Sequence, residues 1–429
     1  MRRFDEAVAR LDRRQPEHMP EPSLDRIRAV SGLLDDPQLT YPTIHVTGTN
    51  GKTTIARAAA DISCAHGVKT GLFTSPHLRS VRERLSVCGV EISEEDFAEE
   101  WLHLEPFLEL IDRAEPGEST YFEAITALAF LWFADKPVGL AVVEVGMGGS
   151  WDATNVVASD VAVIGEIGLD HPELGSTIQE VATEKAGIIK PGKIVVVREQ
   201  PDEALEVVEA RATEVGATVL LEERDWEVEV RVPAVGGQQF RVRGVHETYD
   251  ELFLPMFGEH AVRNVAAAIV AVESIVGHAV DPDATRAAID ALRIPGRLEV
   301  VTRSPLIILD GAHNPAGAEA LARTLSESFT WSRMHVVLAV SSNKDVDGVI
   351  AALAPLADVW YPAQNESVRT FPAEHVAARI AAAAGRVADL GTVEEALAAA
   401  RDAAAVVDLI LVTGSLYTVA DARRALGGS

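Results

Sequence analysis

The stretch IHVTGTNGKTTIARAAA, residues 44–60, decides the fold of the chain. A short β-branched run leads into a glycine loop that holds one lysine, and an alanine-rich helix follows. Backbone N–H groups at the start of such a helix point toward an anion, and the glycines allow a close approach. Lys52 adds a mobile positive charge, and the hydroxyls of Thr53 and Thr54 suit a phosphate or a magnesium ion. The stretch therefore predicts a phosphate-binding loop.

The loop departs slightly from the general pattern GxxxxGK[ST], because Gly48 lies only three residues before Gly51. The alternative is a plain glycine-rich turn with a surface lysine. The order of strand, glycines, lysine, hydroxyls and helix favours nucleotide binding over that alternative. The predicted phosphate contacts are Gly48, Thr49, Asn50, Gly51, Lys52, Thr53 and Thr54.

Short apolar runs alternate with helical stretches from about residue 40 onward. This alternation predicts an α/β fold in which a mostly parallel, doubly wound sheet is covered on both faces. Ligands then bind at the carboxyl ends of the strands. The predicted strands of this sheet are TIHVTG (43–48), KTGLFTS (69–75), GLAVVEVG (139–146), VAVIGEIG (161–168) and KIVVVRE (193–199).

The alternation is interrupted and then restarts. Residues 222–256 alternate polar and apolar side chains, which predicts a short antiparallel excursion, and two helices follow before a break at Pro295–Gly296. After this break the β/α pattern resumes with segments such as PLIILDG and DLILVTGS. We predict an ATP-binding domain over residues 1–296 and a smaller Rossmann-like α/β domain over residues 297–429.

The composition narrows the functional classes. The chain has 429 residues and a formal net charge of −27, which argues against general binding of nucleic acid or anionic membranes. The partners that we expect are small molecules, and nothing in the sequence demands an oligomer, so we expect a monomer. The N-terminal stretch is charged throughout and no apolar run can span a bilayer, so we predict a cytoplasmic protein. Cys64 and Cys88 lie in different segments, and we expect two separate thiols rather than a disulfide framework.

Polar residues follow two predicted strands. Glu144 ends the buried strand of GLAVVEVG, where a carboxylate is costly unless it meets a cation, and Asp170 and His171 lie just beyond VAVIGEIG. Glu144 and His171 together indicate mixed oxygen and nitrogen ligation of Mg²⁺ or Mn²⁺. The alternatives are a helix N-cap or salt bridge for Glu144 and a structural histidine for His171.

Lys185 falls among apolar neighbours at helical spacing in STIQEVATEKAGIIK. Desolvation lowers the pKa of a lysine and favours its neutral, nucleophilic amine. The spacing alone does not separate this possibility from a surface lysine whose stem covers apolar neighbours.

Several motifs in one order resemble the folylpolyglutamate synthase/dihydrofolate synthase family of the Mur ligase superfamily. They are IHVTGTNGK, LFTSPHLRSVRERL, TYFEAITALAF, EVGMGGSWDATN, IGLDHPELGSTIQEVATEKAGIIK, HAVRNVAAA, IPGRLE, LDGAHNPAG and VTGSLY, between residues 44 and 417. The resemblance implies ATP, bound between the two domains, and metal ligation by Ser75, Glu144 and His171. The Thr53 hydroxyl, which the loop pattern assigns to phosphate or magnesium, is predicted as a further metal ligand. It also implies that Lys185 carries a carbamate, and that Asn264, Arg297 and Asp310 contact ATP. The substrate-binding residues that it implies are Ser75, His77, Arg82, Thr120, Tyr121, Phe122, Glu123, Trp151, Asp152, Ala153, His313 and Ser415.

Three segments depart from the family pattern. GTNGKTT replaces the usual GTNGKGS and is closer to the peptidoglycan-building ligases. Ser150 stands where the family usually has arginine, which removes a positive charge near the substrate loop, and Ser23 stands where glycine is usual.

The resemblance implies an amide ligase that adds L-glutamate to dihydropteroate, to folates, or to both. ATP would phosphorylate the substrate carboxylate, and Lys52, Arg297 and the bound metal would stabilise the transferring phosphoryl group. Catalytic roles are expected for Lys52, His171, Lys185 and Arg297. Two alternatives are a Mur-type ligase that acts on a UDP-linked sugar acid and a silent ATP-binding regulatory module. The choice between the two folate acceptors and the polyglutamate chain length do not follow from the sequence.

Overall fold

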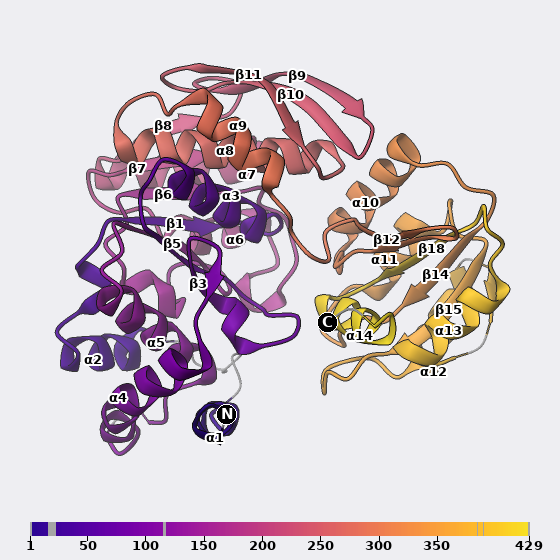
Figure 1. The fold of residues 1–429 in the computed structure, drawn as a ribbon, viewed down its shortest axis with the longest axis horizontal. Coiled ribbons are helices and arrows are strands. Elements are labelled where there is room, and N and C mark those ends of the chain that lie inside the picture. The colour runs from indigo at the N-terminus through magenta and orange to yellow at the C-terminus, as the bar shows by residue number, and fades with distance from the viewer. Residues whose placement is uncertain (1, 16–22, 115–116, 384, 389, 428–429) are drawn as a thin grey trace. The chain divides into compact units, whose positions relative to one another are not determined.

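The computed structural model describes residues 2–15, 23–114, 117–383, 385–388 and 390–427 (Figure 1). Contacts divide the chain into two compact units. The first unit contains residues 1–232, 239–253 and 262–292, and the second contains residues 233–238, 254–261 and 293–429. The predicted boundary after residue 296 remains a prediction of the sequence pattern.

An eight-stranded sheet forms the centre of the first unit, in the order β4-β3-β2-β5-β1-β6-β7-β8. All pairings from β2 to β8 are parallel, and the short strands β3 and β4 add an antiparallel edge. The predicted parallel-dominated α/β sheet is therefore confirmed. The strands are β1 (Thr43–Thr47), β2 (Thr70–Phe73), β3 (Leu85–Val87), β4 (Val90–Glu91), β5 (Leu140–Glu144), β6 (Val161–Ile164), β7 (Ile194–Val197) and β8 (Thr218–Leu221).

The chain direction decides which face each helix covers. From β1 the chain moves through α3 to β2 on one side, whereas from β6 it moves through α6 to β7 on the other. Right-handed crossovers then place α3 and α6 on opposite faces of the sheet. The carboxyl ends of β1 and β6 thus flank the crevice where doubly wound folds bind ligands. The helices of this unit are α1 (Arg2–Asp12), α2 (Asp25–Leu33), α3 (Lys52–Ala65), α4 (Glu94–Asp112), α5 (Tyr121–Asp135), α6 (Ile178–Ala186), α7 (Asp202–Val215), most of α8 (Glu259–Val276) and α9 (Pro282–Ala291).

Alternate side chains of β5 fill the core beneath α4 and α5. Ala141 and Val143 belong to the same buried cluster as Phe130 and Phe133 of α5 and Trp101 of α4. A second buried cluster joins β6 and β7 to α6 and α7. A separate three-stranded sheet of β9 (Glu227–Ala234), β10 (Gly237–Arg243) and β11 (Thr248–Leu254) occupies the predicted excursion.

The second unit has its own mixed sheet, in the order β12-β13-β18-β14-β15-β16, with β17 beside β15. β12 pairs antiparallel with β13, and the other pairings are parallel, which confirms the predicted second α/β unit. Its strands are β12 (Glu299–Arg303), β13 (Leu306–Leu309), β14 (Met334–Leu338), β15 (Val359–Gln364), β16 (Arg386–Val387), β17 (Gly391–Thr392) and β18 (Leu409–Thr413). Its helices are α10 (Pro315–Ser328), α11 (Val346–Leu353), α12 (Ala373–Ala383), α13 (Val393–Ala403) and α14 (Leu416–Ala425).

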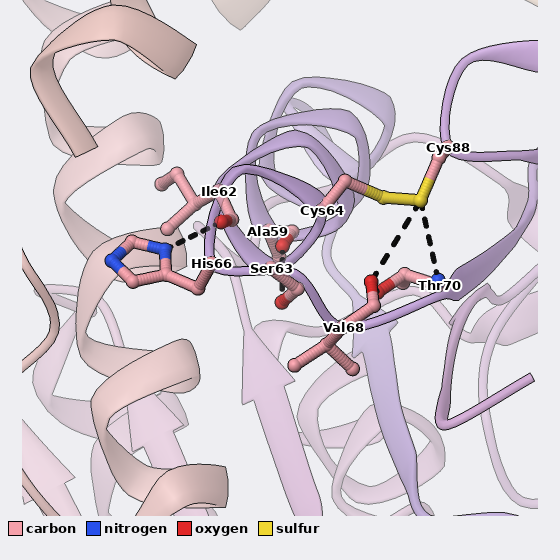
Figure 2. Close-up of a disulfide and its surroundings, with 8 residues drawn as sticks. All are labelled: Ala59, Ile62, Ser63, Cys64, His66, Val68, Thr70 and Cys88. Atoms are coloured by element: carbon pink, nitrogen blue, oxygen red, sulfur yellow. Dashed lines mark hydrogen bonds between the residues drawn. A yellow bond between two sulfur atoms is a disulfide. The ribbon is translucent and has the colours of Figure 1, made fainter. Parts of the chain in front are cut away.

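The two cysteines correct one sequence prediction, because they form a disulfide rather than two separate thiols (Figure 2). Cys64 lies in the last turn of α3, and Cys88 follows β3 in the turn before β4. The amide of Thr70 donates a hydrogen bond to the Cys88 sulfur at 3.4 Å. Antiparallel pairing of β3 with β2 brings Cys88 back beside the end of α3, and this long-range pairing is not visible in the cysteine spacing.

No helix in the described parts of the chain is long and apolar enough to cross a membrane.

Candidate functional site

The phosphate loop connects β1 to α3 at the centre of the larger sheet. Gly51 caps α3 with a left-handed backbone, at φ 81°, and Lys52 is the first residue of the helix. The Lys52 ammonium folds back over the loop and donates to the carbonyl of Gly48 at 3.0 Å. The loop thus holds its one lysine above its own backbone, at the helix N-terminus predicted to receive phosphate.

Glu144 lies at the end of β5, the neighbour of β1, and is 1% exposed. Its Oε1 accepts a hydrogen bond from the Thr53 hydroxyl at 2.8 Å, and its Oε2 accepts one from the Ser75 amide at 3.3 Å. Three segments that are distant in the sequence therefore meet around one buried carboxylate. Oxygen donors of this kind are those that Mg²⁺ prefers.

The loop after β6 is tied to the phosphate loop on its other side. The Thr49 hydroxyl donates to the carbonyl of Gly168 and accepts from its amide, both at 2.9 Å. His171 lies at the end of this loop, where its Nε2 is 3.4 Å from the carboxylate of Asp170. The parallel order β5-β1-β6 thus brings the loops of Glu144, Lys52 and His171 to one edge of the sheet.

Lys185 points from α6 into this region. Its side chain is buried and its Nζ donates to the carbonyl of Gly48 at 2.9 Å. Burial, aided by the nearby charge of Lys52, lowers the pKa of Lys185 to about 7, and Asp170 opposes this effect. A substantial fraction of the amine is therefore neutral near pH 7.

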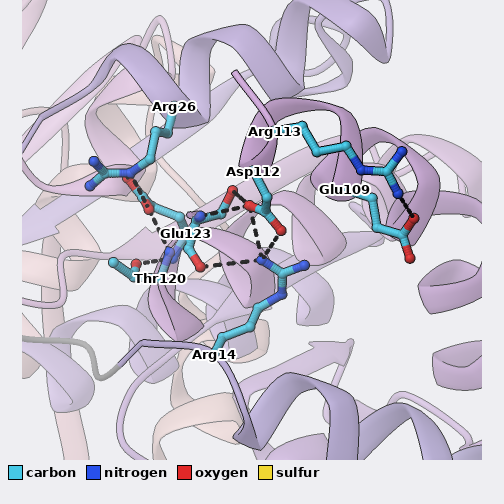
Figure 3. A network of polar contacts seen from close by, with 8 residues as sticks. Arg14, Arg26, Glu109, Asp112, Arg113, Thr120 and Glu123 are labelled. Atoms are coloured by element: carbon cyan, nitrogen blue, oxygen red, sulfur yellow. Dashed lines mark hydrogen bonds and ion pairs between the residues drawn. The ribbon is translucent and has the colours of Figure 1, made fainter. Parts of the chain in front are cut away.

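The predicted substrate segment Thr120–Glu123 begins α5 (Figure 3). Thr120 and Glu123 form a capping box, and both carboxylate oxygens of Glu123 also accept from Arg26 Nε, at 3.0 and 3.1 Å. This ion pair is buried on both sides. The Glu123 carboxylate thus fixes α5 to α2, and its contact with substrate remains a prediction.

Arg84 joins two of the predicted substrate residues. Its Nε donates to His77 Nδ1 at 3.0 Å, and its guanidinium lies over the ring of Tyr121 at 5.1 Å from the centroid. Arg82 instead donates to the carbonyl of Ile92, next to the β3–β4 edge. Arg84 is buried between the two segments.

The segment Trp151–Ala153 follows β5. Asp152 is buried, where it accepts hydrogen bonds from the amides of Met147 and Thr154, and burial raises the pKa of its carboxyl. Ser150, the position where the family carries arginine, donates its hydroxyl to the carbonyl of Glu184 at 3.1 Å. Ser150 therefore contacts the helical turn that carries Lys185.

Asn264 lies on α8 in the first unit, against the phosphate loop. A Cβ atom at Gly51 would come within 2.3 Å of its Nδ2. Its Oδ1 accepts from Arg198 Nη1 at 2.9 Å, and Arg198 is 3.6 Å from the buried carboxylate of Glu222. Sequence reasoning missed Arg198, although it follows β7 directly and the strand-end rule that selected Glu144 applies to it equally.

The remaining predicted residues lie in the second unit, at the carboxyl ends of the neighbouring strands β13 and β18. Asp310 accepts from the amides of Leu298 and Ala312, both at 2.8 Å, and burial raises the pKa of its carboxyl while Arg297 opposes this shift. His313 Nδ1 is 2.9 Å from the carbonyl of Gly311, and Ser415 caps α14. Arg297, Asp310, His313 and Ser415 are thus gathered at one edge of this sheet.

Two family models match the chain. The Mur ligase middle domain matches residues 46–272, and the Mur ligase glutamate ligase domain matches residues 296–416. The dihydrofolate synthase/folylpolyglutamate synthase of Mycobacterium tuberculosis is 40% identical, over 97% of this chain and 92% of the relative. The enzyme of the same description from Escherichia coli is 34% identical, over 89% and 87% of the two chains.

Solved structures agree with these relatives. Folylpolyglutamate synthase of M. tuberculosis, complexed with ADP and AMPPCP, matches with a TM-score of 0.93 and 39% identity over 99% of this chain and 98% of that chain. An E. coli protein in complex with DHPP and ADP matches with a TM-score of 0.89 and 30% identity over 99% and 97%.

Proposed function

The chain belongs to the dihydrofolate synthase/folylpolyglutamate synthase family of ATP-dependent ligases, and from this membership we propose that it joins L-glutamate to dihydropteroate, to folates, or to both. The observation that carries the proposal is the meeting of Thr53, Ser75 and Glu144 beside the phosphate loop. Such a site suits transfer of a terminal phosphoryl group, and the relatives favour folate substrates over UDP-linked sugar acids.

The proposed reaction has two steps. A carboxylate oxygen of the acceptor attacks the γ-phosphorus of ATP, so that ADP leaves and an acyl phosphate forms. The α-amine of L-glutamate then attacks the acyl carbon, an amide bond forms, and phosphate leaves with loss of one proton from the amine. Because two anions meet in the first step, Lys52 lowers its barrier by holding positive charge over the loop.

The chain's own groups fit a bound divalent cation. The buried Glu144 carboxylate and the Thr53 hydroxyl present oxygen atoms at the phosphate loop, with Ser75 adjacent, so these residues and His171 would hold Mg²⁺ or Mn²⁺. When bound, such an ion neutralises charge on the phosphates. Arg297 and Asp310 are proposed to contact ATP, and His313 and Ser415 are proposed to contact the amino-acid substrate.

We also propose that Lys185 is carbamylated. The neutral amine attacks the carbon of CO₂, an N–C bond forms, and one proton passes to water, which leaves an N-carboxylate. Burial and the lowered pKa of Lys185 supply the neutral amine. With ¹³C-labelled bicarbonate, we expect a carbamate ¹³C signal that Lys185→Arg removes and Lys190→Arg retains. A signal of equal size in the Lys185→Arg variant would reject the assignment.

Release of ADP tests the reaction itself. We expect glutamate-dependent ADP release with dihydropteroate, a reduced folate, or both, and none with a UDP-linked sugar acid. ADP release with the sugar acid alone would establish the Mur-type alternative. ATP binding without ADP formation on any acceptor would establish the regulatory-module alternative. The monomeric state and the cytoplasmic location remain predictions from the sequence.

A further inference from the structure

A second group of metal-binding side chains lies on α4 and α5. Glu100 and His103 stand one turn apart on α4, at a spacing that places both on one face of the helix. Asp135 is the last residue of α5, which packs against α4. The potential ligand atoms of these three side chains all lie within 4.8 Å of one another.

Glu100 is the unusual member of this group. It is 8% exposed, and its Oε2 is buried without a hydrogen bond from any residue that the structure describes. Burial raises the pKa of Glu100 to about 8. The Asp135 carboxylate adds to this shift through its charge and through a side-chain hydrogen bond, which requires that one of the two carboxyl groups is protonated. Two carboxyl groups that face each other in a partly desolvated position need either a shared proton or a cation.

The lysine that acts on the Glu100 carboxyl is already engaged in another ion pair. Lys136 follows α5 and forms an ion pair with Asp96 at 2.9 Å, so its attraction for Glu100 is the smallest of the effects on that carboxyl. Charge compensation at Glu100 is therefore incomplete. The neighbouring imidazole of His103 is exposed and can turn its ring nitrogen toward the carboxylates.

We propose that Glu100, His103 and Asp135 bind a divalent transition-metal ion, with Zn²⁺ as the best match. One imidazole nitrogen and two carboxylate oxygens form a common zinc ligand set, and water completes a tetrahedron. Zinc holds such ligand atoms at about 2.0–2.2 Å from the ion, so the three side chains must move closer together when zinc binds. Glu100 is buried, whereas His103 and Asp135 are exposed, so the adjustment falls on these two side chains.

This ion is distinct from the cation proposed at Glu144. Asp135 ends α5, whereas Phe122 in the first turn of that helix lies against Gly146, two residues after Glu144, so about 20 Å of helix separates the two sites. The ion joins α4 to the end of α5 and stabilises their packing. The proposal does not depend on the ligase reaction, because neither its residues nor its test involves the phosphate loop.

Zinc titration of the untagged full chain tests the site. The chain is first freed of metal with a chelator, which is then removed, and excess Mg²⁺ is kept present to occupy hard-cation sites. We expect the wild type and the control Glu99→Gln, an exposed neighbour on α4, to bind one more equivalent of Zn²⁺ than His103→Gln. Glu100→Gln weakens that binding by at least about tenfold.

A stability measurement gives a second readout. We expect ZnCl₂ to raise the Tm of the wild type and of Glu99→Gln, and to leave the Tm of His103→Gln unchanged. Equal zinc stoichiometry and affinity in the wild type and His103→Gln would overturn the proposal. So would a Tm that zinc leaves unchanged in every form, because the cluster would then hold a proton shared by Glu100 and Asp135.

Discussion

Thr53 donates its hydroxyl hydrogen to Glu144 Oε1 at 2.8 Å, and this bond links the phosphate-loop helix to the neighbouring strand β5. Because the Thr53 hydroxyl is also the predicted cation and phosphate contact, its loss should act on the chemical step. We expect Thr53→Val, which keeps the shape of the side chain, to lower kcat by about 100-fold in the ADP-release assay.

Thr183→Val is the matched control for this change. Thr183 donates its hydroxyl to the carbonyl of Gln179 in its own helix α6, on an exposed face, so the same substitution removes a helical threonine hydroxyl that does not contact the phosphate loop. We expect its kcat to stay within about twofold of the wild type. Equal losses in the two variants would show that Thr53 has only a structural role.

The buried amine of Lys185 predicts a pH dependence of stability. Its pKa in the folded chain is about 7, below the value of about 10.4 for an unfolded lysine. Between these two pH values the unfolded chain binds more protons than the folded chain, so the free energy of unfolding rises with pH. Below pH 7 the amine is protonated in both states, and its contribution to the free energy of unfolding no longer changes with pH.

Comparison with Lys185→Met isolates this contribution. We expect the free energy of unfolding of the wild type, relative to the variant, to rise by on the order of 1 kcal/mol per pH unit from pH 7.5 to 9.5. Denaturation by guanidinium chloride in CO₂-free buffer measures it, because the amine then meets neither CO₂ nor the cyanate that urea solutions contain. A relative stability that does not change over this range would contradict the lowered pKa.

The Cys64–Cys88 disulfide predicts a thiol-dependent stability. The bridge closes a loop of 24 residues, which corresponds to about 3 kcal/mol of restricted unfolded-state entropy. We expect the double variant Cys64→Ser/Cys88→Ser to unfold at a lower temperature than the oxidised chain and to be insensitive to dithiothreitol. A thiol assay on the denatured, unreduced chain provides the control, and detection of both cysteines as free thiols would refute the bridge.

Local patterns predicted the parts of this molecule that depend on neighbours in sequence. Helical periodicity and capping signals gave the helix after Asp281, and glycine, lysine and hydroxyl spacing gave the loop before α3. Pairing between distant segments was not predictable from one sequence. The Cys64–Cys88 bridge depends on β2 pairing with β3, and the partner of Arg198 is Asn264, which lies 66 residues further along the chain.

We predict that the phosphate loop accepts no side chain at the position of Gly51. Its φ is 81°, and a Cβ atom would also meet the side chain of Asn264 at 2.3 Å. We expect Gly51→Ala to abolish measurable ATP binding in a calorimetric titration. Gly67→Ala is the control, since Gly67 has a φ of 77° with nothing within 4 Å of the added atom. Gly67→Ala should lose about 1 kcal/mol of stability and keep ATP binding. Weakened ATP binding in both variants would show that backbone strain, and not the contact with Asn264, causes the loss.

We predict that Arg198 affects nucleotide binding by orienting the side chain of Asn264. Its Nη1 donates to Asn264 Oδ1, which leaves the amide nitrogen of Asn264 toward Gly51. We expect Arg198→Met to raise the KM for ATP at least about tenfold with a smaller change in kcat, because the Asn264 amide loses its fixed orientation.

The control for Arg198 is Arg263→Gln. Arg263 pairs with the same buried Glu222 at 2.7 Å, whereas the bond to Asn264 comes from Arg198. Both variants leave the Glu222 carboxylate with one partner fewer, so both should lose about 3 kcal/mol of stability, as buried ion pairs do when one partner is removed. A KM for ATP that rises equally in the two variants would mean that the network acts through stability and not through Asn264. A rise confined to Arg198→Met would assign the orientation of Asn264 to this one hydrogen bond.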